Sequence, residues 1–162
     1  TWIWYGKPNL PQTLNGALAG LVSITAGCGN MSAIGAVFAG LIGGIIVVFS
    51  IEFIEKKLKI DDAIGAASVH GVAGAWGTLV VGLWGIDGEI GIGLFNGGGA
   101  AQLGVQAIGV LAYAVWSVVL SFIVFKLLKS TMGLRVTEED ETVGLDLSEH
   151  GEIAYPGKRD RG

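Results

Sequence analysis

The sequence predicts an all-α integral membrane protein, on three observations. Of the 162 residues, 51% are hydrophobic and only 15% are charged, whereas soluble domains average about 25% charged residues. The chain holds 28 glycines but only three prolines, and the glycines are spread through apolar runs. Small residues in such runs are typical of membrane helices, because they let two helix backbones approach closely. Finally, the apolar runs are long enough to cross a bilayer, which takes about 20 residues.

Four runs predict four spans, at about residues 12–30, 31–53, 63–86 and 102–128. The first is the shortest, and lies at the lower edge of the length that crosses a bilayer. The second and fourth have uncharged centres. The third carries a single ionisable group, His70. Residues 1–134, which contain these four runs, form the predicted membrane domain.

The distribution of basic residues predicts the orientation. If the four segments span in order, all ten Lys and Arg residues of the chain fall on one side of the membrane. Cytoplasmic loops carry the excess of Lys and Arg, so we expect this side, including the carboxy-terminal tail, to be cytoplasmic. The protein is then a multi-pass protein of the cell membrane.

Small residues four positions apart predict the faces on which the helices touch. Such pairs weaken a helix in water, but in lipid they mark helix–helix contacts. The pairs are Gly16 and Gly20, Gly40 and Gly44, and Gly71 and Ala75.

His70 stands alone in the stretch "AASVHGVAGAW", residues 66–76. In a helix beginning at residue 63 it would lie about 12 Å along the span, near the middle of the bilayer. Ionisable groups at such depth usually face a bundle interior or a water-filled path. A neutral imidazole donates from one nitrogen and accepts with the other, which suits a proton relay. The alternative is a structural histidine bonded to Ser68, Ser23, Thr25 or a backbone carbonyl.

Other kinds of site find little support. A single cysteine, Cys28, allows no internal disulfide, and no Cys or His spacing suggests a metal site. No basic stretch indicates nucleic acid binding, and we expect no cofactor. The tail, residues 135–162, is acidic and polar, which is typical of disorder; Thr137 followed by Asp140 instead suggests a capped short helix.

Three stretches resemble the ammonium transporter family (Amt/Mep/Rh). "KIDDAIGAASVHGVAG" resembles the penultimate core helix, whose motif reads roughly DD-x-x-D-x-x-G-V-H-G-V-x-G. "GKPNLPQTLNGALAGLVSITAGCG" resembles an earlier helix of the family, and "VWSVVLSFIVFKLLKSTMGLRVTEEDETVGLDLSEHGEIAYP" its last helix and tail. The resemblance implies the ammonium transporter fold, with the last four of eleven spans and the tail in this chain. We therefore expect a fragment of a longer polypeptide.

The resemblance implies a function. Family members are homotrimers with a narrow apolar pore in each subunit, where two histidines meet at mid-pore. His70 aligns with the second histidine, and the first belongs to the part of the protein that precedes this chain. We expect Thr25, Ala66 and Val69 to line the pore, and Asp62 to cap and orient the third span. The substrate would be ammonium or ammonia. The alternative is an ammonium sensor or signalling scaffold that conducts little. The sequence shows no arrangement of acid–base or nucleophilic residues that would indicate an enzyme.

For the tail, the resemblance implies coupling between subunits and regulation by a PII-type nitrogen-signalling protein. The tail residues that carry this expectation are Gly144, Leu145, Asp146, His150, Gly151 and Glu152.

The chain departs from the family pattern beside the histidine. Gly65 stands where the family commonly has a third acid, Ala66 and Ala67 replace bulkier residues, and Ser68 replaces a glycine. In the earlier helix, Ala26 replaces a proline. These changes predict a different pore width beside His70.

Overall fold

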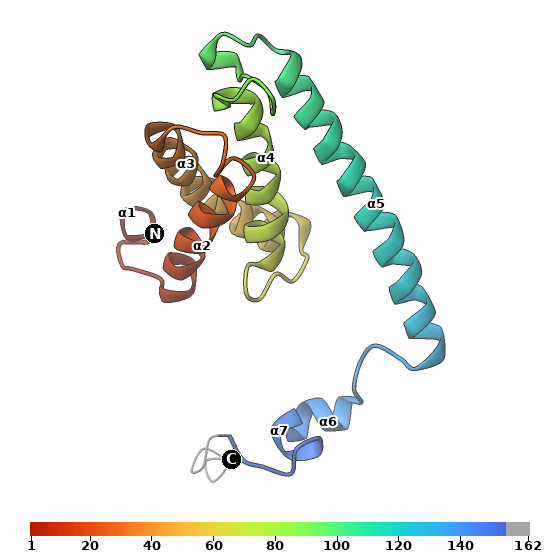
Figure 1. Ribbon diagram of the computed structural model, residues 1–162. Coiled ribbons are helices and arrows are strands. Elements are labelled where there is room, and N and C mark those ends of the chain that lie inside the picture. The colour runs from red at the N-terminus through yellow and green to blue at the C-terminus, as the bar shows by residue number, and fades with distance from the viewer. Residues whose placement is uncertain (155–162) are drawn as a thin grey trace. The chain divides into compact units, whose positions relative to one another are not determined.

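The computed structural model describes residues 1–154, and every regular element in that range is a helix, which confirms the predicted all-α class (Figure 1). The chain divides into two compact units, residues 1–114 and 115–162, and each is described by itself. The elements are the α-helices α1 (Trp2–Tyr5), α2 (Leu10–Thr25), α3 (Ala33–Glu52), α4 (Ala73–Trp84), α5 (Ala101–Thr131), α6 (Glu138–Val143) and α7 (Leu145–Ser148), the π-helices η1 (Phe53–Leu58) and η2 (Ala67–Val72), and the 3-10 helix η3 (Leu94–Asn96).

In the part of the chain that the structure describes, three helices are long and apolar enough to cross a membrane: Ala33–Leu58, Ala67–Trp84 and Ala101–Thr131. They correspond to the second, third and fourth predicted spans. The first predicted span corresponds to α2, which has 16 residues and a length of about 24 Å at 1.5 Å per residue. That α2 crosses the bilayer stays a prediction.

Two boundaries of the three long helices differ from the predicted ones by four or five residues, more than their other boundaries do, and both have local reasons. The second span continues as η1 to Leu58 and ends where Lys59 takes a left-handed conformation, with φ of 54°. The third begins at Ala67 rather than residue 63, because Gly65 has a φ of 74°. A helix cannot continue through a left-handed residue.

Helices α2, α3 and η2–α4 pack side by side (Figure 1), and buried apolar side chains form a core between them. Ala19, Val47, Ile51, Val69 and Ala73 form this core, and none of them is more than 5% exposed.

Glycines bring α2 and α3 into backbone contact. A Cβ atom added at Gly20 would lie 3.6 Å from the carbonyl oxygen of Gly40, and one added at Gly44 would lie 3.6 Å from that of Gly16. The structure therefore confirms two of the predicted contact pairs. A Cβ atom at Gly71 would meet no atom within 4 Å among the described residues, so the third pair makes no such contact there.

Ser23 marks the point where all three helices meet. Its side chain is fully buried, and its hydroxyl donates to the carbonyl of Ala19, 2.6 Å away in the same helix. A Cβ atom at Gly43 of α3 would overlap the Ser23 hydroxyl, and one at Gly77 of α4 would lie 2.8 Å from the Ser23 carbonyl oxygen. Glycine at these two positions is what allows the close crossing.

The loop that follows α4 is anchored by one buried side chain. Asn30, which is 2% exposed, accepts hydrogen bonds at Oδ1 from the backbone N–H groups of Ile86 and Asp87. Its Nδ2 donates to the carbonyl of Gly91, at 3.2 Å. A loop rich in glycine thus takes a defined course against the α2–α3 turn.

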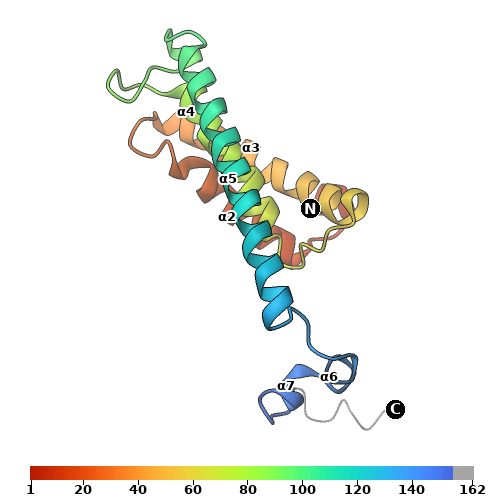
Figure 2. The same ribbon diagram turned by 90° about the vertical axis from the view of Figure 1, so that its right-hand side faces the viewer.

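In the second unit, α6 and α7 fold against each other (Figure 2). The Thr137 side chain accepts from the N–H of Asp140 at 3.2 Å, which confirms the predicted cap. Residues 155–162 of the predicted tail lie outside the described residues.

We expect Gly77→Ala to lower the apparent melting temperature of the full-length protein in detergent. The added methyl group meets the Ser23 backbone, which cannot move aside without separating α2 from α4, and overpacking typically costs about 1–3 kcal/mol. Gly74→Ala in the same helix is the matched control, because its Cβ would meet only Val22 Cγ1 at an ordinary 3.8 Å. Equal melting temperatures for the two variants would contradict the close crossing.

Candidate functional site

The site is built on the first turn of η2, which Asp62 caps from the preceding loop. Asp62 Oδ1 accepts from the N–H of Ala67 at 2.9 Å, and Oδ2 accepts from the N–H and the hydroxyl of Ser68 at 3.1 and 2.9 Å. The first amides of a helix have no partner within the helix. A carboxylate satisfies them and interacts favourably with the positive end of the helix dipole.

The environment of Asp62 favours its charged form. Its side chain is only 6% exposed, and desolvation by itself raises the pKa of the carboxyl. The hydrogen bonds from Ala67 and Ser68 outweigh that effect, so the pKa lies below its ordinary value. The cap is therefore an ionised carboxylate at neutral pH.

A second helix joins this cap through two serines. The Ser50 hydroxyl, on α3, donates to the Ser68 hydroxyl at 3.0 Å. The Ser68 hydroxyl in turn donates to Asp62. Both serines are buried. The three side chains form a continuous chain from α3 through η2 to the loop.

Gly65 shapes the loop between Asp62 and η2. Its positive φ of 74° is one that glycine adopts without strain, and a Cβ atom there would overlap the amide nitrogen of Asn15 on α2. That amide donates to the carbonyl of Ile64 at 3.0 Å. With this backbone conformation, there is no room for a side chain at Gly65, the position where the family pattern commonly has an acid.

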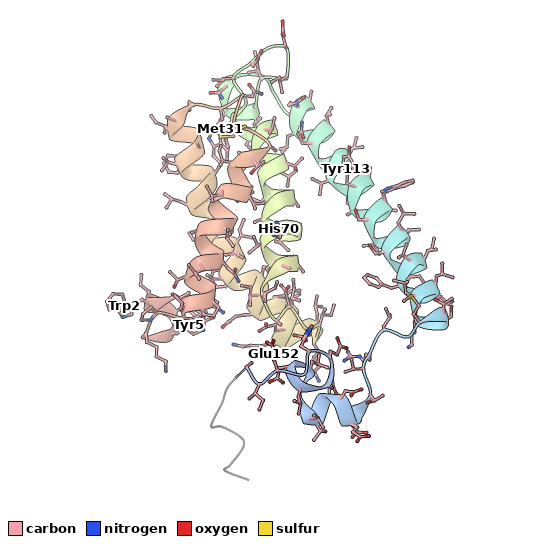
Figure 3. The ribbon with its side chains drawn as sticks, turned by 60° about the horizontal axis from the view of Figure 1, so that its bottom comes forward. Trp2, Tyr5, Met31, His70, Tyr113 and Glu152 are labelled. Carbon is pink, nitrogen blue, oxygen red and sulfur yellow. The ribbon has the colours of Figure 1, made fainter. Side chains whose placement is uncertain are left out.

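His70 lies in the first turn of η2, because the left-handed backbone at Gly65 delays the start of this helix to Ala67. It is three residues from the start of the helix, about 4.5 Å along its axis, rather than the 12 Å expected from a start at residue 63. Its side chain is exposed and makes no hydrogen bond within residues 1–154. Figure 3 shows α2 and α3 on one side of the helix that carries His70.

The side chains proposed as structural partners of His70 are engaged elsewhere. Ser68 bonds to Asp62 and Ser50, and Ser23 donates to Ala19. The Thr25 hydroxyl donates to the carbonyl of Leu21 at 2.7 Å. Both imidazole nitrogens of His70 are therefore available to a group from outside the described residues.

The predicted pore-lining residues fall into two environments. Ala66 is exposed, as His70 is, and Thr25 is exposed on the last turn of α2. Val69 is 2% exposed and packs in the bundle core against Ala19 and Val47. The structure thus brings Ala66 and His70 to the surface of one helix start and places Val69 in the core.

Among the predicted tail residues, Asp146 accepts hydrogen bonds from two residues that follow it in the tail. The carbonyl of Asp146 accepts from the N–H of Glu152 at 2.9 Å, and its Oδ2 accepts from the N–H of Ala154 at 3.0 Å. Gly144 and Gly151 have positive φ angles of 99° and 65°, which permit the turns on either side of α7. Leu145 begins α7, and His150 is exposed.

Sequence reasoning missed Ser50 and Asn15. Both lie in other helices, and their partners lie 18 and 49 residues away in sequence, so no local pattern signals the contact. Within residues 1–154, no three His, Cys, Asp or Glu side chains are grouped so that they would hold a metal ion.

These features define the class: a multi-pass helical membrane protein with an imidazole, at the start of an apolar span, that no other described residue pairs with. The sequence model of the Ammonium Transporter Family matches residues 1–155. The chain belongs to the ammonium transporter family.

Curated relatives are named as ammonium transporters. The chain is 38% identical over 165 residues to ammonium transporter Amt2 of Archaeoglobus fulgidus, covering 96% of this chain and 35% of that protein. It is 40% identical over 153 residues to ammonium transporter Amt1 of Haloferax mediterranei, covering 94% and 28%. A solved structure titled "Sensor Amt Protein" superposes with a TM-score of 0.83 at 39% identity, covering 91% and 36%. The chain spans about a third of the length of these proteins.

Asp62→Ala is expected to destabilise the full-length protein by about 1–3 kcal/mol, since it leaves buried donors without acceptors. Faster amide exchange at Ala67 and Ser68 is the local signature to measure. Asp61→Ala is the matched control, because Asp61 is the exposed neighbouring acid. An Asp62 variant with the stability and exchange rates of the Asp61 variant would contradict the cap.

The cap also predicts a pH dependence. Because the pKa of Asp62 is lowered on folding, its stabilising effect is complete above the pKa of an unfolded aspartate, about 3.9, and is lost as the pH falls through the lower folded value. The stability difference between wild type and Asp62→Asn should therefore be constant from pH 7 to about pH 5 and shrink only below about pH 4. A difference that disappears already near pH 6 would contradict this assignment.

Proposed function

We propose that the full-length protein carries ammonium across the cell membrane, that it moves ammonia through an apolar path in each subunit, and that His70 handles the proton. The observation that carries the proposal is the exposed imidazole at the start of a membrane span, which has no hydrogen-bond partner among residues 1–154. The family membership and the transporter names of the relatives support the substrate.

Electrostatics explains why an imidazole belongs in such a path. Moving a bare cation into an apolar medium costs on the order of 20 kcal/mol in the idealised Born limit. Loss of a proton converts ammonium into neutral ammonia, which does not incur this cost. A neutral imidazole accepts the proton or a hydrogen bond at one nitrogen and donates from the other, so it adds no fixed charge to the path.

The open surface around His70 fits a partner from the rest of the protein. A polar group in an apolar surrounding needs a hydrogen-bond partner, and no described residue provides one. We propose a second histidine from the preceding part of the polypeptide, with Ala66 and Thr25 beside the path. Val69 is not included, because its side chain is buried in the core.

We propose that the carboxy-terminal tail lies in the cytoplasm, because all Lys and Arg residues fall on its side of the membrane if the four segments span in order, and cytoplasmic loops carry the excess of such residues. A homotrimer and a PII-type partner of the tail complete the proposal. The compact fold of α6 and α7 around Asp146 supports a tail that presents a defined surface to a protein.

A second candidate is an ammonium sensor of the same fold. The solved structure that matches this chain at 39% identity bears the word sensor in its title. A sensor that conducts little would bind ammonium without sustained uptake, so a transport measurement separates the two functions.

The test is ammonium current and labelled methylammonium uptake by the full-length protein in liposomes. We expect His70→Ala and His70→Glu to assemble but to change the current or the ammonium selectivity by at least about tenfold. A tenfold change corresponds to about 1.4 kcal/mol in the free-energy barrier to transport. Asp61→Ala, which changes an exposed ionisable residue outside the span, is the control and should conduct like wild type. Wild-type transport by both His70 variants would contradict the proton-handling role, and no transport by wild type would favour the sensor.

Removal of residues 135–162 tests the role of the tail. We expect the shortened full-length protein to lose binding to a PII-type protein in a pull-down assay. Asp146→Ala should weaken the same binding, since it removes the acceptor of the Ala154 N–H. Undiminished binding by both variants would contradict a tail-based partner site.

A further inference from the structure

We propose that Ser68 and Ser50 are positioning residues for His70: their hydroxyl bridge sets the rotation of η2 so that the imidazole faces outward. The inference rests on the proposed function and deepens it. At position 68 this chain departs from the family pattern, which has a glycine where Ser68 stands. A glycine has no hydroxyl that could form such a bridge.

Ser68 takes part in four hydrogen bonds through three of its atoms, the backbone nitrogen, the hydroxyl oxygen and the carbonyl oxygen. Its N–H and its hydroxyl both donate to Asp62 Oδ2, at 3.1 and 2.9 Å. Its oxygen also accepts from the Ser50 hydroxyl at 3.0 Å, and its carbonyl accepts from the N–H of Ala73, five residues ahead. Since its side chain is fully buried, water does not compete for these bonds.

The bond from Ala73 to Ser68 encloses His70. It closes a π-turn, in which the hydrogen bond spans five residues rather than four, and π-turns inside α-helices are frequent at functional sites. The direction of a side chain inside the turn depends on how the turn is rotated about the helix axis. Ser68 and Val69 face the core, and His70, one residue further on, is exposed.

The Ser50 hydroxyl is the part of this arrangement that belongs to another helix. Asp62 and Ser68 alone fix the start of η2 to its own loop. The bond from Ser50 fixes it to α3, whose position follows from the glycine contacts with α2. Loss of the bridge therefore leaves the fold in place, with Val69 still packed in the core, but loosens the turn that carries His70.

The experiment compares Ser68→Ala, Ser50→Ala and Ser23→Ala in the full-length protein. The first two variants break the bridge. Ser23→Ala is the matched control, because Ser23 is equally buried but its hydroxyl bonds only within its own helix. The readouts are the ¹⁵N signals of the His70 ring, identified by their loss in His70→Ala, and the ratio of ammonium to methylammonium transport.

We expect both bridge variants to shift or broaden the His70 ring signals and to change the transport ratio, beyond the difference between Ser23→Ala and wild type. Ser68→Gly should behave like Ser68→Ala. If Ser68→Ala does not assemble, Ser50→Ala decides, since it leaves the Asp62 cap intact. Ring signals and transport ratios equal to those of Ser23→Ala would overturn the inference. If the wild type does not transport, the proposed function fails, while the ring signals still test the positioning.

Discussion

The carboxylate of Asp62, buried against the first amides of η2, is the interaction on which the site depends. A buried charge is tolerated only when it is paired or fully hydrogen-bonded, and here three donors from two consecutive residues meet it. Because these donors belong to the helix start, the carboxylate fixes where the third span begins. The position of His70 relative to the core follows from that start.

Close backbone packing provides the frame for this interaction. Gly20 and Gly40 let α2 and α3 touch, and Gly43 and Gly77 make room for Ser23 at the three-helix crossing. Helices packed this closely leave little freedom for a helix start to shift. In lipid, where apolar side chains gain little by leaving the solvent, such contacts between small residues carry much of the association.

The sequence predicted the helical class, three of the long spans, two glycine contact pairs and the Thr137 cap, because each rests on a local pattern of hydropathy, small residues or side-chain capping. It did not predict the start of the third span. The apolar run includes residues 63–66, and only the left-handed backbone at Gly65 shows that the helix begins later. Nor did it predict Ser50 or Asn15, since their contacts depend on how the helices pack. The exposure of His70 likewise depends on how the helices pack. That an ionisable residue lies in this apolar run, by contrast, is evident from the sequence alone.

In the proposed function, His70 faces an apolar path and meets a second imidazole from the rest of the polypeptide. The most direct test is an experimental structure of the full-length protein at a resolution that places side chains. We expect a His70 ring nitrogen to lie at hydrogen-bonding distance, about 2.7–3.2 Å, from a nitrogen of another histidine, with both rings lining a narrow passage. A His70 ring that faces lipid, or that is bonded only to a backbone carbonyl away from any passage, would contradict it.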